Sequence, residues 1–218
     1  MINICFHGIG IPGRRLEPGE DRYWIRSDTY YTLLDEIASR SDVHVSFDDG
    51  NASDVEIGLP GLLERGLSAS FFVVAGRVGG AGSLCQDELR ELQRQGMEIG
   101  SHGMDHRPWP DLRNEARHDE LEGARHRLEE LLDAKVDTAA VPLGRYNRRL
   151  LNDLKRLGYR RVYTSDRRHS CSPDAWLQPR FSVRKQDTVS NLRAEVLGQP
   201  PASRRLTTNV KSIYKRLI

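Results

Sequence analysis

Short apolar runs of strand length alternate along this chain with longer stretches in which apolar residues return at helical spacing. Apolar residues recur at positions i, i+3, i+4 and i+7 in Tyr30, Leu33, Leu34 and Ile37, as on one face of a helix. The strand-like runs between such stretches cover residues 2–6, 43–47, 69–74, 97–100, 138–141, 161–164 and 177–183. This alternation predicts an α/β fold with a parallel sheet or barrel.

Glycines mark the ends of several predicted helices. We expect helices over residues 56–65, 84–95 and 148–157, and each is followed directly by a glycine, a residue that readily ends a helix. The longest predicted helix covers residues 114–133 and places Leu121, Ala124 and Leu128 on one apolar stripe. We interpret the charged residues on its other faces as a solvated surface.

Composition limits the classes of protein that the chain can be. With 218 residues, 38% of them hydrophobic, the chain can bury the core of one domain, and nothing indicates a second. Its 33 basic residues are interleaved with 31 acidic ones, which argues against nucleic acid as the main partner. Cys5, Cys85 and Cys171 have no disulfide-type spacing, so we expect free thiols in a reducing compartment.

Two polar clusters follow strand-like runs and contain metal-ligating residue types. They are Ser46-Phe47-Asp48-Asp49-Gly50 and Ser101-His102-Gly103-Met104-Asp105-His106. Four residues advance ~6 Å on a helix and ~13 Å when extended, so His102 and His106 can share an ion only if the chain turns after Ser101, and we expect a helical turn. Either cluster alone is often coincidence or a solvated turn. Together, at strand ends, they predict a metal site with a carboxylate beside it for proton transfer.

Because of these clusters, the chain resembles the polysaccharide deacetylases of the NodB-homology type, carbohydrate esterase family 4. The family's first motif reads T/S-F-D-D-G, which residues 46–50 match at every position. Its second motif reads H-S/T-x-x-H, and this chain keeps both histidines with Gly103 in place of the hydroxyl residue. Residues 66–73, 96–100 and 141–147 also look like family segments. The resemblance covers roughly residues 2–183 and implies a distorted (β/α)7-type barrel, a single domain over residues 1–198.

The resemblance also implies roles in removing acetyl groups from an N-acetylated carbohydrate. Asp49, His102 and His106 would hold a divalent metal ion, which we expect to be Zn2+, and Asp48 would be the general base. A backbone N–H from Pro142-Leu143-Gly144 would stabilise the tetrahedral oxyanion. A general acid must then protonate the departing amine.

The usual family acid, a histidine in a late L-x-x-H segment, is missing from this chain. The histidines after His106 are His118, His126 and His169, and none stands in that context. His7 follows the first predicted strand and would point at the same rim, so we favour it as the acid over a structural role.

A second departure lies two residues before Pro142, where many members carry an arginine that orients the catalytic aspartate. This chain has Ala140 there, and Arg180 is a candidate replacement, with a purely structural role as the equal alternative. Trp176 could stack on a sugar ring, although a tryptophan near a strand start is more often part of the core. We include Arg180 and Trp176 among the substrate-binding candidates.

Both ends of the chain bear on its location. Residues 199–218 lie outside the resemblance and read as a linker followed by a basic helix that touches an anionic membrane or a partner, or packs on the barrel. The amino terminus has no basic region before a long apolar core, and no run of ~18 apolar residues occurs anywhere. We therefore expect a cytoplasmic protein, with peripheral membrane contact as an alternative.

Three functions are compatible with these features. The first is a metal-dependent deacetylase of N-acetylated sugars in a polysaccharide or glycan precursor. The second is a hydrolase of another amide, such as a formylated aminosugar or a small amide. The third is a catalytically inactive carbohydrate-binding homologue. The complete set of Asp48, Asp49, His102 and His106 argues against the third, because a binding module needs no base beside its metal ligands.

Overall fold

Parallel strands form a single sheet whose spatial order, β7-β6-β5-β4-β3-β2-β1-β8, follows the chain except at its last strand. The computed structural model describes residues 1–167 and 170–198. The strands are β1 (Ile2–Phe6), β2 (Val43–Asp49), β3 (Ala69–Val73), β4 (Glu98–Ser101), β5 (Thr138–Ala140), β6 (Arg161–Thr164), β7 (Leu177–Pro179) and β8 (Phe181–Ser182). All the strand runs predicted from the sequence are present. The runs at 2–6 and 161–164 match their strands to the residue, the last run divides, and the others shift by one or two residues at their ends.

One extended segment closes the sheet into a nearly complete barrel. Its first half, β7, pairs with β6, and its second half, β8, pairs with β1 on the far edge of the sheet. Arg180 stands between the two halves, at the point where the chain changes partners. The predicted seventh strand, 177–183, is therefore two short strands. The distorted barrel is confirmed, with eight parallel strands where seven strand runs were predicted.

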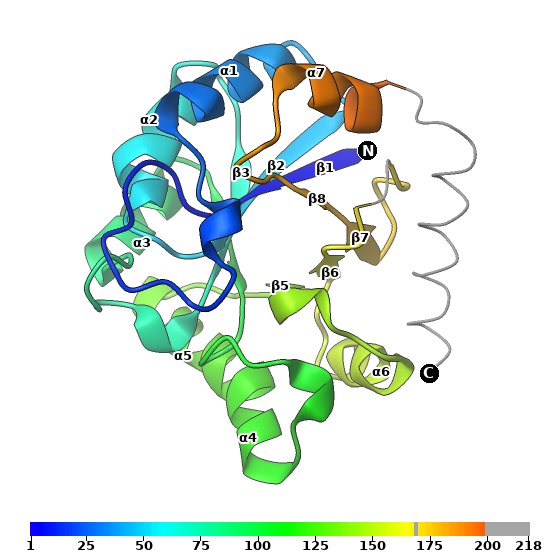
Figure 1. Cartoon of the computed structure of the whole chain (residues 1–218). Helices are drawn as coiled ribbons and strands as arrows, with labels where there is room; N and C mark the ends of the chain where they lie inside the picture. Colours follow the sequence, from blue (N-terminus) through cyan, green and yellow to red (C-terminus); the bar gives the residue numbers. More distant parts are fainter. Residues whose placement is uncertain (168–169, 199–218) are drawn as a thin grey trace.

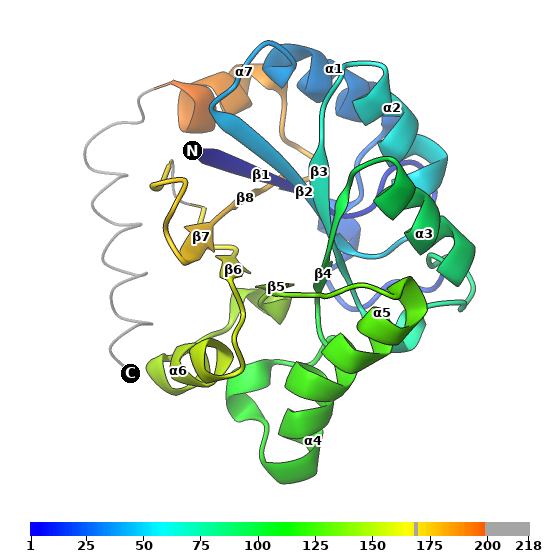
Figure 2. The same ribbon diagram turned by 180° about the vertical axis from the view of Figure 1, so that it is seen from behind.

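Helices surround the strands, as Figures 1 and 2 show from opposite sides. They are α1 (Ser27–Ile37), α2 (Leu59–Leu63), α3 (Gln86–Arg94), α4 (Asn114–His118), α5 (Ala124–Leu132), α6 (Arg148–Arg156) and α7 (Val189–Leu192). The long helix predicted over 114–133 is present as α4 and α5, joined by a π-helical turn at Asp119–Gly123. A second π-helical turn, Asp54–Gly58, begins the helix that α2 continues. The short helix α7 has no counterpart among the predicted helices.

Three further sequence predictions concern membrane crossing, the cysteines and residues 199–218. Within residues 1–167 and 170–198, none of the helices combines the length and the hydrophobicity needed to cross a bilayer. The three cysteines are free, as the spacing predicted. The linker and basic helix predicted for 199–218 lie outside the described residues.

Alternation along the strands separates an apolar outside from a polar inside. In β2, Val45 and Phe47 belong to the large apolar cluster shared with the helices, whereas the intervening Ser46 and Asp48 are buried polar residues. Arg180 from the closing segment is fully buried and donates to both Ser46 and Asp48. The barrel interior is therefore built to hold charge at its carboxyl end.

At the opposite, amino end, the interior holds a hydrogen-bonded cluster around His44. The Nε2 atom of His44 lies 3.1 Å from the Ser70 hydroxyl, which donates to Glu98 at 2.5 Å. Burial lowers the pKa of His44 to about 4, with the Glu98 carboxylate opposing the shift. The imidazole is therefore neutral in the folded protein near pH 7.

Protonation of His44 should make folding dependent on pH. Its folded pKa lies below the unfolded value, so the unfolded chain binds the proton first and stability falls as the pH drops from about 6.5 to about 4. We expect His44→Gln to reduce the loss of unfolding free energy between pH 7 and pH 4.5 by about 2 kcal/mol, measured by urea denaturation. His118→Gln, at an exposed helix position, is the matched control and should keep the full loss. Equal losses in the parent and His44→Gln would rule His44 out as the cause.

Candidate active site

The carboxyl ends of β2 and β4 bring the two predicted polar clusters together. Asp48 and Asp49 are the last residues of β2, and His102 directly follows β4, where its backbone N–H donates to Val73 at 2.8 Å. Asp49 has a φ of 80°, which ends the strand alternation and leaves its carboxylate on the same side as that of Asp48. Both carboxylates lie 3.8 Å from Nε2 of His102.

The two histidines are brought together by a turn, as predicted, but the turn is not helical. Gly103 and His106 have φ values of 86° and 56°, and the ring centroids of His102 and His106 lie 5.1 Å apart. The turn is tied to the chain after β3, because Gly103 and Met104 accept hydrogen bonds from the backbone N–H groups of residues 75 and 76. The proximity of the histidines is confirmed, and the expected helical geometry is wrong.

A buried glutamate from the long helix supports this turn. The Glu120 carboxylate accepts hydrogen bonds from the backbone of Met104 at 3.0 Å and of Asp105 at 2.8 Å, and from the Trp109 indole at 3.1 Å. A Cβ atom at Gly103 would lie 2.2 Å from the same carboxylate, so glycine is required where the family usually has a hydroxyl residue. Glu120 is buried and was not predicted as a site residue, because the charge of this helix was expected to face solvent. Helical spacing from Ala124 and Leu128 places it on the apolar stripe, which was the available signal.

Asp49, His102 and His106 offer ligand atoms that all lie within 4.8 Å of one another. The Nδ1–H of His102 donates to Ala140 at 2.8 Å, and that of His106 to Glu17 at 2.8 Å, so both Nε2 lone pairs are left facing Asp49. The Oδ1 atom of Asp49 is buried and has no hydrogen-bond partner among residues 1–167 and 170–198. Burial lowers the pKa of His102 to about 4 and keeps it neutral. This donor set fits a divalent cation.

Asp48 forms a two-point ion pair with Arg180 inside the barrel. The two guanidinium nitrogens donate to its two oxygens at 2.6 and 2.7 Å. Burial alone would raise the pKa of Asp48, but the Arg180 guanidinium, with His102, holds that pKa well below its ordinary range. Arg180 therefore contacts Asp48, as expected of a residue that replaces the arginine missing at position 140.

His7 lies on the other side of Asp48, where β1 ends. Its ring stacks on Tyr23 with centroids 4.7 Å apart, and its Nε2 atom lies 3.9 Å from Oδ2 of Asp48. Cys5, His7 and Asp48 also bring ligand-type atoms within 4.8 Å of one another. That group fits an ion less well, because the Arg180 guanidinium already neutralises the Asp48 carboxylate and would repel a second cation.

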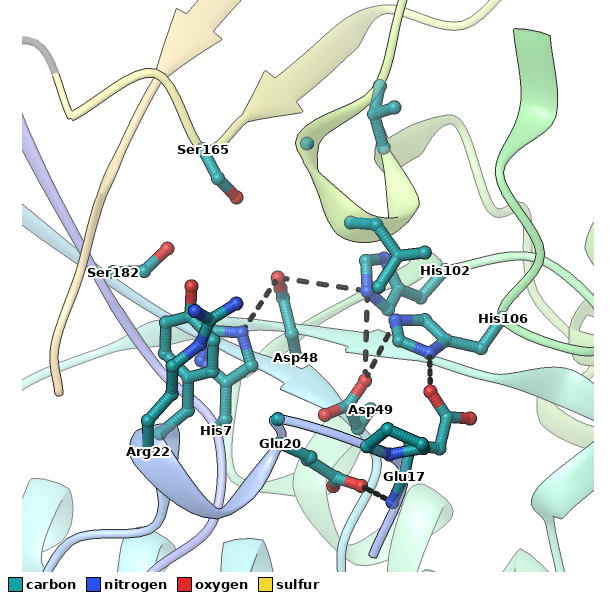
Figure 3. A pocket seen from close by; sticks show the side chains of 16 residues that line it. His7, Glu17, Glu20, Arg22, Asp48, Asp49, His102, His106, Ser165 and Ser182 are labelled. Atoms are coloured by element: carbon teal, nitrogen blue, oxygen red, sulfur yellow. Dashed lines mark hydrogen bonds and ion pairs between the residues drawn. The ribbon is translucent and has the colours of Figure 1, made fainter. Parts of the chain in front are cut away.

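Five of these residues line a cavity of about 240 Å³, shown in Figure 3: His7, Asp48, Asp49, His102 and His106. Arg180 is buried behind Asp48 and does not line it. Part of the cavity wall comes from the loop between β1 and α1, through Glu17, Glu20, Arg22 and Tyr23. The sequence analysis named none of these residues. The length of the segment 7–26, with no regular pattern and directly after a strand, was the signal that could have found them.

The turn after β5 provides another part of the wall. Leu143 and Gly144 line the cavity, whereas Pro142 is buried and does not. Proline has no N–H, and the N–H of Gly144 donates to Val141 at 3.2 Å. Among the described residues, the N–H of Leu143 has no backbone acceptor and is the available donor of this turn. Leu143 has a φ of 56° at the exposed tip.

Trp176 does not belong to this site. It precedes β7 and therefore lies at the amino end of the barrel, opposite the cavity. Its indole N–H donates to the Tyr159 carbonyl at 2.8 Å, and its ring packs with the apolar cluster under α6 and beneath the Lys155 ammonium. The expectation of a sugar-stacking residue at this site is corrected, and the alternative that the tryptophan is part of the core is the one that the packing supports.

A family model described as polysaccharide deacetylase matches residues 35–162. A curated relative, YxkH of Bacillus subtilis (strain 168), whose name refers to the same family, is 24% identical over 153 residues. That alignment covers 66% of this chain and 55% of YxkH, so the chain spans about half the length of the curated relative it matches.

Solved structures of low sequence identity share the fold. The Streptococcus pyogenes deacetylase PplD in complex with acetate superposes with a TM-score of 0.76 at 18% identity, over 88% of this chain and 96% of that one. BC0361, a polysaccharide deacetylase from Bacillus cereus, gives a TM-score of 0.72 at 17% identity, over 88% and 67%. These comparisons support the barrel and its strand order.

The buried pair of Asp48 and Arg180 should be strongly coupled in stability. Arg180→Met leaves a buried carboxylate without its counter-charge, and we expect a loss of about 3–5 kcal/mol in unfolding free energy at pH 7 in the presence of chelator. Adding Asp48→Asn removes the stranded charge, so the double variant should be more stable than Arg180→Met alone. Losses that simply add in the double variant would contradict the pairing. Urea denaturation of the two single variants and the double variant makes the comparison.

Proposed function

Since the family model spans more than half of the chain, the protein belongs to the polysaccharide deacetylase family, and we propose that it removes acetyl groups from N-acetylated sugars of a polysaccharide or glycan precursor. The observation that carries this proposal is the position of Asp48, an ionised carboxylate immediately beside the donor set of Asp49, His102 and His106. A binding module would not need this arrangement of a charged base and a cation site in one cavity.

We assign Asp49, His102 and His106 as the residues that hold a divalent ion, with zinc the best match to one carboxylate and two imidazoles. An ion held there supplies Lewis acidity that polarises the acetyl carbonyl and favours ionisation of water. The hydrogen bonds from Nδ1 of His102 and of His106 support this assignment, because they fix both rings in the tautomer that a ligand requires.

Asp48 acts as the general base for the attacking water in this proposal. The Arg180 guanidinium keeps the carboxylate ionised at neutral pH and fixes its orientation toward the cavity. Oδ2 retains a lone pair that can accept the water proton, since a carboxylate oxygen accepts more than one hydrogen bond. The attack forms a C–O bond at the acetyl carbon and gives a tetrahedral oxyanion, to which the Leu143 N–H donates.

His7 completes the reaction as the general acid. Its Nε2 atom faces the same cavity, 3.9 Å from Asp48, and stacking on Tyr23 limits the orientations of the ring. Transfer of its proton to the amine nitrogen allows the C–N bond to break and releases acetate and the free aminosugar.

The size of the cavity bears on the substrate. About 240 Å³ is less than the ~300–1,000 Å³ of pockets that enclose drug-sized ligands. We therefore propose that one acetamido sugar unit enters and that the neighbouring units of the glycan remain outside.

The role of Asp48 can be separated from that of the ion ligands. With N-acetylglucosamine oligomers as substrate, we expect Asp48→Asn to retain zinc and lower the rate of acetate release by ~10²-fold or more, because only the proton acceptor is removed. His102→Ala should instead lose the ion, as measured by metal analysis of the purified protein. Loss of zinc in Asp48→Asn would show that the two adjacent aspartates have the opposite roles. Hydrolysis of a formylated aminosugar or a small amide, with no acetate released from these oligomers, would reassign the substrate.

The role of His7 can be tested with two leaving groups. An amine must be protonated before it departs, whereas the phenolate of an activated aryl acetate needs no proton. We expect His7→Ala to slow amide hydrolysis by ~10²-fold or more and to affect the aryl ester much less. His118→Ala, at an exposed helix position, is the matched histidine control. Equal losses on both substrates would return His7 to a structural role.

A further inference from the structure

His106 depends on a residue far away in sequence for its orientation. It ends a non-helical turn with a φ of 56°, outside any helix or strand. Its Nδ1 atom lies 2.8 Å from Oε2 of Glu17, a residue of the loop between β1 and α1, and Figure 3 shows this carboxylate against the ring. His102, in contrast, is held by the Ala140 carbonyl of the adjacent strand. The imidazole of His106 is therefore positioned by a loop, and that of His102 by the sheet.

The Glu17 carboxylate is itself fixed in place. Its other oxygen pairs with Arg77, which ends the short turn after β3 that is also hydrogen-bonded to the histidine turn. The backbone N–H of Glu17 donates to Glu20 at 2.8 Å. Glu20 pairs with Arg14, whose guanidinium also reaches Asn51, two residues after Asp49. The loop is thus fastened to both sides of the candidate ion site.

We propose, on the basis of the function proposed above, that Glu17 is a positioning residue that sets the affinity of the Asp49–His102–His106 site for its cation. A carboxylate that accepts the Nδ1–H fixes the tautomer and aims Nε2 at Asp49, 3.5 Å away. Because coupling is reciprocal, ion binding holds the loop over the cavity by the same free energy with which the loop strengthens ion binding. The site and its wall then form as one unit.

Zinc affinity measures how much Glu17 strengthens ion binding. Competition with a chromogenic chelator should give a Kd for Glu17→Gln that is ~10–100-fold weaker than that of the parent, as for other partners of metal-bound histidines. Arg77→Met, which keeps the carboxylate and removes its second anchor, should show a smaller loss in the same direction. Asp21→Asn, on the same loop but outside the cavity lining, is the matched control for loss of charge and should bind zinc like the parent. Thermal unfolding without zinc should be the same for Glu17→Gln and the parent.

Tryptic cleavage measures how much ion binding holds the loop between β1 and α1 in place. Arg15 and Arg22 are exposed on the loop, and zinc should slow cleavage after them in the parent by a larger factor than in Glu17→Gln. Equal zinc affinity in the parent and Glu17→Gln overturns the positioning role, and equal protection of the loop overturns the coupling. Failure of the parent to bind zinc would instead remove the ion site itself, and with it the function proposed above.

Discussion

The ion pair between Asp48 and Arg180 joins the closure of the barrel to the chemistry of its carboxyl end. Arg180 lies between β7, which pairs with β6, and β8, which pairs with β1. Its side chain crosses the interior to Asp48 of β2. A buried charge without its partner costs several kcal/mol. Closing the barrel therefore provides the counter-charge that keeps Asp48 ionised. The ionised state of Asp48 is therefore linked to the last strand pairing.

This constraint explains why the interior is polar although the sheet is buried on both sides. Alternation in β2 gives Val45 and Phe47 to the apolar layer under the helices and gives Ser46 and Asp48 to the inside, where Arg180 binds both. Asp49 escapes the alternation only because its φ is positive. Two adjacent carboxylates consequently face one cavity, with Arg180 neutralising one of them and two imidazoles beside the other.

Local pattern was sufficient to predict the strands, a parallel sheet or barrel, and the two polar clusters, because each depends on residues close together in sequence, and the resemblance to a family added the distorted barrel. Contacts between segments far apart in the sequence were harder to predict. The pairing of Arg180 with Asp48 could be suggested but not chosen over a structural role, and the tryptophan at 176 was grouped with the wrong end of the barrel. Glu17 lies in a loop without periodicity, so only the length of that loop distinguishes it from other exposed acids.

Strained backbone at the site explains why Glu17 and Glu120 are needed there, although neither is among the predicted metal ligands. Asp49, His106 and Leu143 all have positive φ, a conformation that costs a residue with a side chain roughly 1–2 kcal/mol. Such strain persists only where surrounding contacts determine the conformation. Glu120 accepts from the backbone N–H of Asp105, directly before His106, and Glu17 binds the His106 ring, so one carboxylate holds the turn and the other holds the imidazole. Both are therefore as much part of the site as the histidine they hold.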